Sequence, residues 1–203
     1  MAFEYGQYTN ATIALFANDQ TACFDRLFPS LTNVVLRSYG IEPSVTKCRS
    51  HTVDQMQRRC KTGLGISDDH YCNTKGDPII AGEIQGKADT GCAWTLHSGY
   101  LLTAYDMLHP PMRLPDVSGD TTLGITKAND AFVDDVDSWA ALMQYGDDAS
   151  RQVIEQSQEG AQIWTGLQTV VGQSTSFPKS AVQLLGHKES QASPGTLEID
   201  YGF

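Results

Sequence analysis

Hydrophobic and polar positions along the chain fall into blocks that predict its secondary structure. Residues 11–18 form a compact apolar run with the length of a buried strand. Apolar side chains then recur every three or four positions across residues 27–39, which predicts a helix with Pro29 in its first turn and Gly40 at its end. Residues 44–62 predict a second, more basic helix that begins at a serine cap.

The rest of the chain continues this mixture of helices and strands. Gly, Asn, Asp and Pro separate its apolar segments, as turn residues do. In chain order, we expect a hairpin within 63–84, a helix at 90–108, a loop at 111–121, two strands within 122–141, an amphipathic helix at 147–171, and strands at 181–186 and 196–201.

This order of elements predicts the fold class. Strands and helices follow one another without an internal repeat, a linker or a low-complexity tract, so we expect a single domain over residues 1–203. The order suits an α+β fold, in which helices pack on one face of a largely antiparallel sheet.

Composition narrows the functional classes. No run of about 18 apolar residues is present, so we expect no membrane-spanning helix and no membrane partner. The first twenty residues do not resemble a signal peptide, and the five cysteines show no C-x-x-C spacing, so we expect an intracellular protein with reduced thiols and no zinc site. The net charge of −10 argues against tight, nonspecific binding to nucleic acid.

Two adjacent carboxylates, Asp134 and Asp135, stand between apolar residues that predict strands. Like charges repel, and a divalent cation with oxygen ligands would offset that repulsion. Asp19 also follows an apolar strand directly, so neighbouring strands would bring the three carboxylates together around two metal ions. The alternative is a solvated hairpin turn, where Asp is common. The spacing of a calcium-binding loop is absent.

Four short motifs, taken in order, resemble those of one family. They are "NDQTACFDRL" around Asp19, "GEIQG" at 82–86, "AFVDD" ending at Asp135, and "GLQTVVGQSTSFPKS" ending at Ser180. Together they resemble the reverse transcriptase domain, an RNA-dependent DNA polymerase, of eukaryotic retroelements. The resemblance covers roughly residues 11–186 and implies the palm region of the polymerase.

The resemblance implies roles for the acidic residues and one lysine. Asp19 and Asp134 would hold two Mg²⁺ or Mn²⁺ ions, and Asp135 would assist at the primer end. Lys179 would lie near the pyrophosphate leaving group as a proton donor, or else be a solvated surface lysine. Phosphoryl transfer depends mainly on positioned cations and neutralised charge, which agrees with this set of residues.

The resemblance also implies contacts with the nucleotide and the template. Phe24 would lie under the nucleotide sugar and exclude the 2′-hydroxyl, although an aromatic residue beside a helix start also suits a core position. Gln85 and Gly86 would contact the incoming dNTP and the template. The partners would be an RNA or DNA template with its primer, and the rest of a retroelement polyprotein. Asp25 and Asp137 are interpreted as structural.

Several features depart from the family pattern. "KADTG" follows the "GEIQG" motif, where the family has small residues and Ser-Pro. The basic fingers would lie upstream and the thumb downstream, so we expect a truncated or decayed copy that extends a primer poorly. Two alternatives stay open: an RNA-dependent RNA polymerase, and a non-catalytic polymerase-like module with a binding or structural role.

Overall fold

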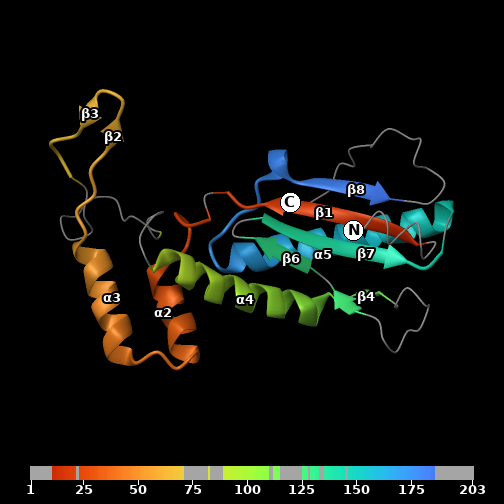
Figure 1. The fold of residues 1–203 in the computed structure, drawn as a ribbon, viewed down its shortest axis with the longest axis horizontal. Helices are drawn as coiled ribbons and strands as arrows, with labels where there is room; N and C mark the ends of the chain where they lie inside the picture. Colours follow the sequence, from red (N-terminus) through yellow and green to blue (C-terminus); the bar gives the residue numbers. More distant parts are fainter. Residues whose placement is uncertain are drawn as a thin grey trace. The chain divides into compact units, whose positions relative to one another are not determined.

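Figure 1 shows the chain as a ribbon, in a computed structural model. The structure forms two compact units, Met1–Thr21 with Tyr100–Phe203, here called the sheet unit, and Ala22–Gly99, here called the helical unit. The residues that the structure describes are 11–21, 23–70, 82, 89–109, 112–114, 125–127, 129–132, 135–144 and 146–185.

A four-stranded antiparallel sheet forms the centre of the sheet unit (Figure 1). Strand β1 pairs with β7 on one side and with β8 on the other, so it lies in the interior of the sheet. A separate pair, β4 and β5, is also antiparallel. In the order β6-β7-β1-β8, the four strands are Asn129–Phe132, Asp135–Leu142, Thr12–Asp19 and Ala181–Leu185, while β4 is Met112–Leu114 and β5 is Ile125–Lys127.

Two helices cover one face of this sheet. Helix α5 (Asp147–Val170) contributes Val153 to a core cluster with Phe16 of β1. The last half of α4 (Thr90–Leu108) contributes Tyr105 to a second cluster that also contains Val136 of β7. Side chains alternate between the two faces of a strand, so alternate residues of β1 and β7 point toward the helices and the others point away.

The helical unit is built on a pair of helices, α2 (Pro29–Ser38) and α3 (Pro43–Gln55). Each begins with a proline, whose fixed φ suits the first helical turn. Gly40 lies in the connection with φ +85°, a left-handed conformation that favours glycine. A short hairpin follows, with β2 at Lys61–Thr62 and β3 at Gly65–Ile66, and the unit's apolar cluster joins Cys23, Leu27, Ala93 and Trp94.

Much of the predicted secondary structure is confirmed. The chain combines helices with antiparallel sheets, as the expected α+β class requires. The strand at 11–18, the helices at 27–39, 90–108 and 147–171, and the strand at 181–186 correspond to β1, α2, α4, α5 and β8, with ends that differ by at most two residues.

Other predicted segments differ from the structure in part or lie outside the described residues. Helix α3 ends at Gln55 rather than at residue 62, because the chain turns extended at Met56, and its start lacks the serine cap. The predicted loop at 111–121 contains β4, which is stabilised by pairing with β5. The two strands expected within 122–141 are confirmed as the antiparallel pair β6 and β7, and the region also contains β5. Apart from His70 and Gly82, the apolar runs of the predicted 63–84 hairpin lie outside the described residues, as does the strand at 196–201.

Within the described ranges, none of the helices combines the length and the apolar character that crossing a lipid bilayer requires.

Candidate functional site

Asp19 and Asp135 are direct partners across two adjacent strands. Asp19 is the last residue of β1, Asp135 is the first residue of β7, and the antiparallel register pairs the two. Directly opposite residues carry their side chains on the same face, with Cβ atoms about 4.5–5.5 Å apart. Their neighbours Asn18 and Val136 are buried, so both carboxylates belong to the sheet face that α5 leaves uncovered.

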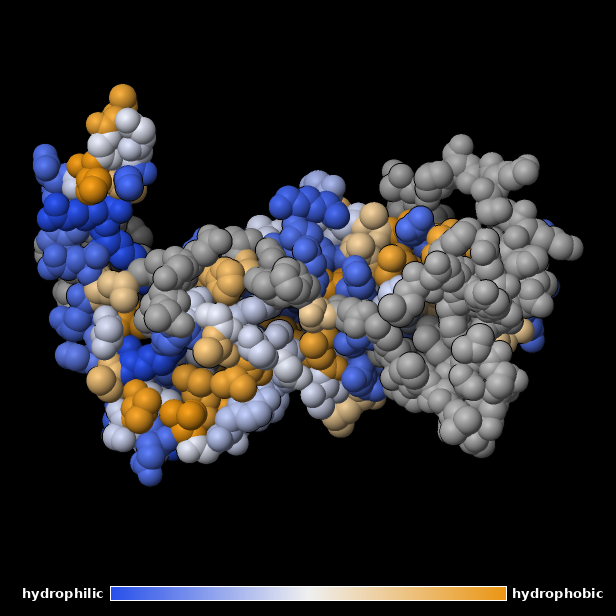
Figure 2. Space-filling model, in the orientation of Figure 1, coloured by the Kyte–Doolittle hydropathy of each residue, from blue (hydrophilic) through white to orange (hydrophobic). Residues whose placement is uncertain are grey.

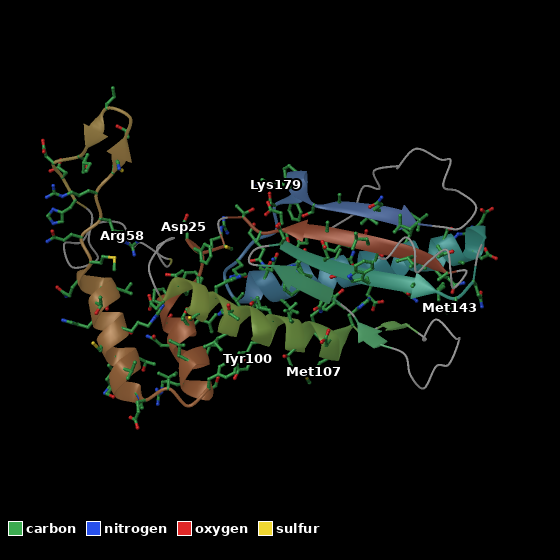
Figure 3. All side chains as sticks on the ribbon, in the orientation of Figure 1. Asp25, Arg58, Tyr100, Met107, Met143 and Lys179 are labelled. Carbon is green, nitrogen blue, oxygen red and sulfur yellow. The ribbon has the colours of Figure 1, made fainter. Side chains whose placement is uncertain are left out.

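Lys179 provides a positive charge at the same position. Its Nζ lies 3.0 Å from Oδ2 of Asp19. Lys179 ends the short 3-10 helix Phe177–Lys179, which leads into β8, and Figure 3 shows it where β1 ends and β8 begins. The Lys179 side chain is 72% exposed while that of Asp19 is only 15% exposed, so the lysine approaches a mostly buried carboxylate from the solvent side.

Backbone hydrogen bonds hold this lysine next to β1. The amide of Ser176 donates to the carbonyl oxygen of Asp19 at 2.8 Å, and the amide of Lys179 donates to Ser176 at 2.9 Å. Ser180 Oγ lies 3.2 Å from the Oδ1 atom of Asn18, to which it donates. The segment before β8 is therefore attached to the end of β1 at several points, which fixes the backbone position of Lys179.

Buried polar side chains continue this arrangement beyond the end of β1. Gln20 forms a bridge with Thr175, and both are almost fully buried. Thr175 donates to Oε1 of Gln168 at 2.5 Å and also contacts the hydroxyl of Thr165 at 3.2 Å. No local sequence signal predicts this cluster, because its members come from the residue after β1, from α5 and from the segment before β8.

Asp137, which was interpreted as structural, lies on the same sheet face as Asp135. It is two residues further along β7 and opposite Ala17 of β1. Its strand neighbour on the other side is Asp130 of β6. The uncovered face near the site therefore carries Asp137 as well as Asp19 and Asp135, and only the alternation along β7 could have indicated this.

The structure describes part of the "GEIQG" motif and none of Asp134. Asp134, Gln85 and Gly86 lie outside the described residues, so their predicted roles stay predictions. Gly82 is buried, and a Cβ atom there would collide with the backbone of Asp25. The first glycine of the motif therefore permits a close backbone approach within the helical unit.

Phe24 belongs to the helical unit and packs against its apolar cluster. Its ring forms an edge-to-face contact with Trp94, with centroids 6.2 Å apart. The ring is partly buried against this cluster, which favours the alternative of a core position. A role at the nucleotide sugar stays a prediction.

The residues at the end of β1 have the chemistry that binds a hard cation. Oδ2 of Asp19 is buried, and Nζ of Lys179, 3.0 Å away, is its ion-pair partner. Carboxylate oxygens are ligands that Mg²⁺ and Mn²⁺ prefer, so a bound ion would share Asp19 with the lysine or replace it. Among the described residues, no three His, Cys, Asp or Glu side chains gather closely enough to hold a metal ion.

No family model matches the chain, and no curated protein matches it.

Proposed function

We propose that the chain is the palm of an RNA-directed DNA polymerase, which extends a primer by two-metal nucleotidyl transfer. One observation carries the proposal: Asp19 and Asp135 are cross-strand partners at the end of β1, with Lys179 3.0 Å from Asp19. The sequence resemblance predicts these three residues as members of one site, although they come from three separate segments. Their proximity is the main support for that resemblance.

Each residue of the site would have its own role in the reaction. The primer 3′-hydroxyl loses its proton to water, and its oxygen forms a bond to the α-phosphorus of a dNTP. The bond from that phosphorus to the bridging oxygen breaks, and pyrophosphate leaves with the electron pair. Bound Mg²⁺ or Mn²⁺ would lower the pKa of the 3′-hydroxyl and offset the charge of the phosphates. Asp19 and Asp135, with Asp134, would hold the metal ions. Lys179 would donate a proton to the leaving pyrophosphate or neutralise its charge.

The contact between Lys179 and Asp19 also supports a second candidate, a non-catalytic module with a polymerase-like fold. The lysine already supplies Asp19 with a counter-charge at 3.0 Å. A carboxylate that is neutralised in this way does not require a metal ion, so the pair would be purely structural in such a module.

Calorimetry with Mn²⁺ and dTTP would separate the two candidates. We expect the chain to bind Mn²⁺ in the presence of dTTP, and Asp19→Asn and Asp135→Asn each to weaken that binding at least tenfold. Asp68→Asn is the matched control, because Asp68 is exposed in the helical unit and far from the site in sequence. Equal binding by all four proteins, or no binding by the wild type, would favour the non-catalytic module.

Primer extension on an RNA template tests the reaction itself. We expect any extension product to depend on Mg²⁺ or Mn²⁺ and to disappear in Asp135→Asn. A product that persists in both Asp19→Asn and Asp135→Asn would contradict the proposed site.

A further inference from the structure

The charges of the chain are unevenly distributed. Residues 26–61 contain seven Lys and Arg but only two Asp and Glu, a net charge of +5, whereas the other 167 residues carry −15. This segment includes α2, α3 and β2 of the helical unit. Figure 2 shows hydrophilic residues over α3 and the base of the β2–β3 hairpin. Although the whole chain is acidic, this one segment is therefore basic.

A groove between α2 and α3 lies within this basic segment. Its volume is about 520 Å³. Arg37 of α2 and Lys47 and His51 of α3 line it, together with a single carboxylate, Asp54. Lys47 and His51 are four residues apart, so they lie on one side of α3, about 6 Å apart along its axis.

The floor of the groove is a connected polar network. Asn33 of α2 donates to the hydroxyl of Ser50 on α3, and Arg49 donates to Oδ1 of Asn33 at 3.3 Å. Arg49 also forms an ion pair of 2.9 Å with Asp89, and its side chain is only 9% exposed. These contacts join the two helices, so the groove is held in shape by groups that bind one another.

Two cations at the rim of the groove are exposed to solvent. Arg37 and Lys47 are exposed, and neither forms an ion pair with another described residue. Beyond α3, Arg59 and Lys61 are also exposed. Arg58 instead donates to the carbonyl oxygen of Gly82 at 3.4 Å, which holds the base of the hairpin (Figure 3).

We propose that the groove between α2 and α3 binds the phosphodiester backbone of a nucleic acid. That the partner is a nucleic acid rests on the proposed function. Exposed Arg and Lys side chains that neutralise phosphates supply most of the affinity of nonspecific nucleic-acid binding. At physiological ionic strength the Debye length is about 8 Å, so more distant acidic residues of the chain oppose this binding only weakly.

A membrane surface fits the groove less well. Binding to anionic lipid combines cations with apolar side chains on the opposite face of one amphipathic helix. Here the cations surround a floor of amide and hydroxyl groups, with Val34 as the exposed apolar residue of the lining. The hairpin does expose Leu64 and Ile66, and for this reason vesicles are included in the test.

Fluorescence anisotropy with a labelled RNA–DNA heteroduplex tests the proposal. The full chain is titrated in EDTA at several salt concentrations, so binding is measured without catalysis. We expect the double variant Arg37→Gln/Lys47→Gln to bind about tenfold or more weakly near 0.1 M salt, and the slope of log K against log salt to decrease by about 1–2. The effect should be the same for duplexes of different sequence.

Arg151→Glu is the matched control. Arg151 is exposed on α5 in the sheet unit, and the substitution changes the net charge by the same −2 as the double variant. We expect it to leave the heteroduplex affinity within about twofold of the wild type, because Arg151 is not among the residues that line the groove. Equal losses of affinity in the double variant and in Arg151→Glu would show a general charge effect and would overturn the proposal that the groove is the binding site.

Two further outcomes bear on the inference. If the chain binds phosphatidylserine vesicles through Arg37 and Lys47 but does not bind the heteroduplex, the groove is a lipid site and the proposal is wrong. If Asp19→Asn and Asp135→Asn bind the heteroduplex as well as the wild type does while both groove substitutions weaken it, the proposal is supported. That result would stand even if no primer extension were found, because it concerns binding in EDTA.

Discussion

Asp19 and Asp135 face each other across the ladder of β1 and β7, where one strand ends and the other begins. Two carboxylates in directly opposite positions repel each other, so the native chain carries a local electrostatic cost at this point. Lys179 offsets part of that cost through its contact with Asp19. The same arrangement that weakens the fold is the one that would attract a divalent cation.

Asp135→Asn should therefore stabilise the chain when metal ions are removed. We expect the free energy of unfolding in EDTA to rise by about 0.2–1 kcal/mol, the usual size of a cross-strand charge effect. Any stabilisation that Mg²⁺ gives the wild type should decrease in this variant. Urea unfolding with and without Mg²⁺ measures both effects, and a loss of stability in EDTA would contradict the assumed repulsion.

Lys179→Gln should have the opposite effect. The substitution leaves Asp19 opposite Asp135 without the nearby positive charge. We expect a loss of at most about 1 kcal/mol, because the ammonium group is largely exposed and solvent screens it. Lys179→Arg keeps the charge and should retain most of the stability. Equal unfolding midpoints for the Gln and Arg variants would mean that the ion pair contributes nothing measurable.

Substituting alanine for each of two glycines of α5 should change the stability of the chain in opposite directions. A Cβ atom at Gly160 would lie 2.5 Å from the hydroxyl of Tyr105, which is buried. A Cβ atom at Gly166 would meet no described atom within 4 Å beyond its chain neighbours and the nearby backbone of its own helix. We expect Gly160→Ala to destabilise by about 1–3 kcal/mol through overpacking. Gly166→Ala should stabilise by about 0.5–1 kcal/mol, because alanine favours the helix more than glycine does.

Removing the Tyr105 hydroxyl tests whether a clash with it explains the effect of Gly160→Ala. Tyr105→Phe should rescue part of the stability lost in Gly160→Ala, since the predicted clash is with the hydroxyl. Thermal unfolding of the single and double variants gives the coupling energy. An additive result would mean that Gly160 is required for some reason other than its contact with Tyr105.

His97 should make the chain less stable in mild acid. It is 2% exposed, stacks on Trp94, and neither ring nitrogen has a hydrogen-bond partner among the described residues. Burial lowers the pKa of His97 from its ordinary value of 6.5. Below pH 6.5 the unfolded chain therefore takes up a proton that the folded chain does not, and stability falls as the pH decreases toward the folded pKa.

The slope from this one group should approach about 1.4 kcal/mol per pH unit within that window. His97→Phe keeps an aromatic ring against Trp94 and should remove this part of the pH dependence. His51→Gln is the control, because His51 is exposed on α3. Urea midpoints at pH values above and below 6.5 measure the difference, and an unchanged slope in His97→Phe would contradict the assignment.

The sequence predicted the elements whose signals are local. Helix α4 occupies residues 90–108 as expected, because its apolar content, its length and the prolines that follow it are all properties of one segment. The end of α3 was predicted wrongly for the opposite reason. Residues beyond Gln55 keep helix-forming side chains, but Arg58 contacts Gly82, a residue far along the chain, and the backbone leaves the helix.

The same distinction between local signals and tertiary contacts applies to the candidate site. That Asp19 ends a buried strand and that Asp135 lies at a strand boundary could be predicted from hydrophobic patterns alone. Their pairing, the approach of Lys179 to Asp19, and the groove between α2 and α3 required the tertiary structure. Periodicity identifies which residues share a face of one element, whereas the contacts between elements depend on strand register and helix packing, which no single segment encodes.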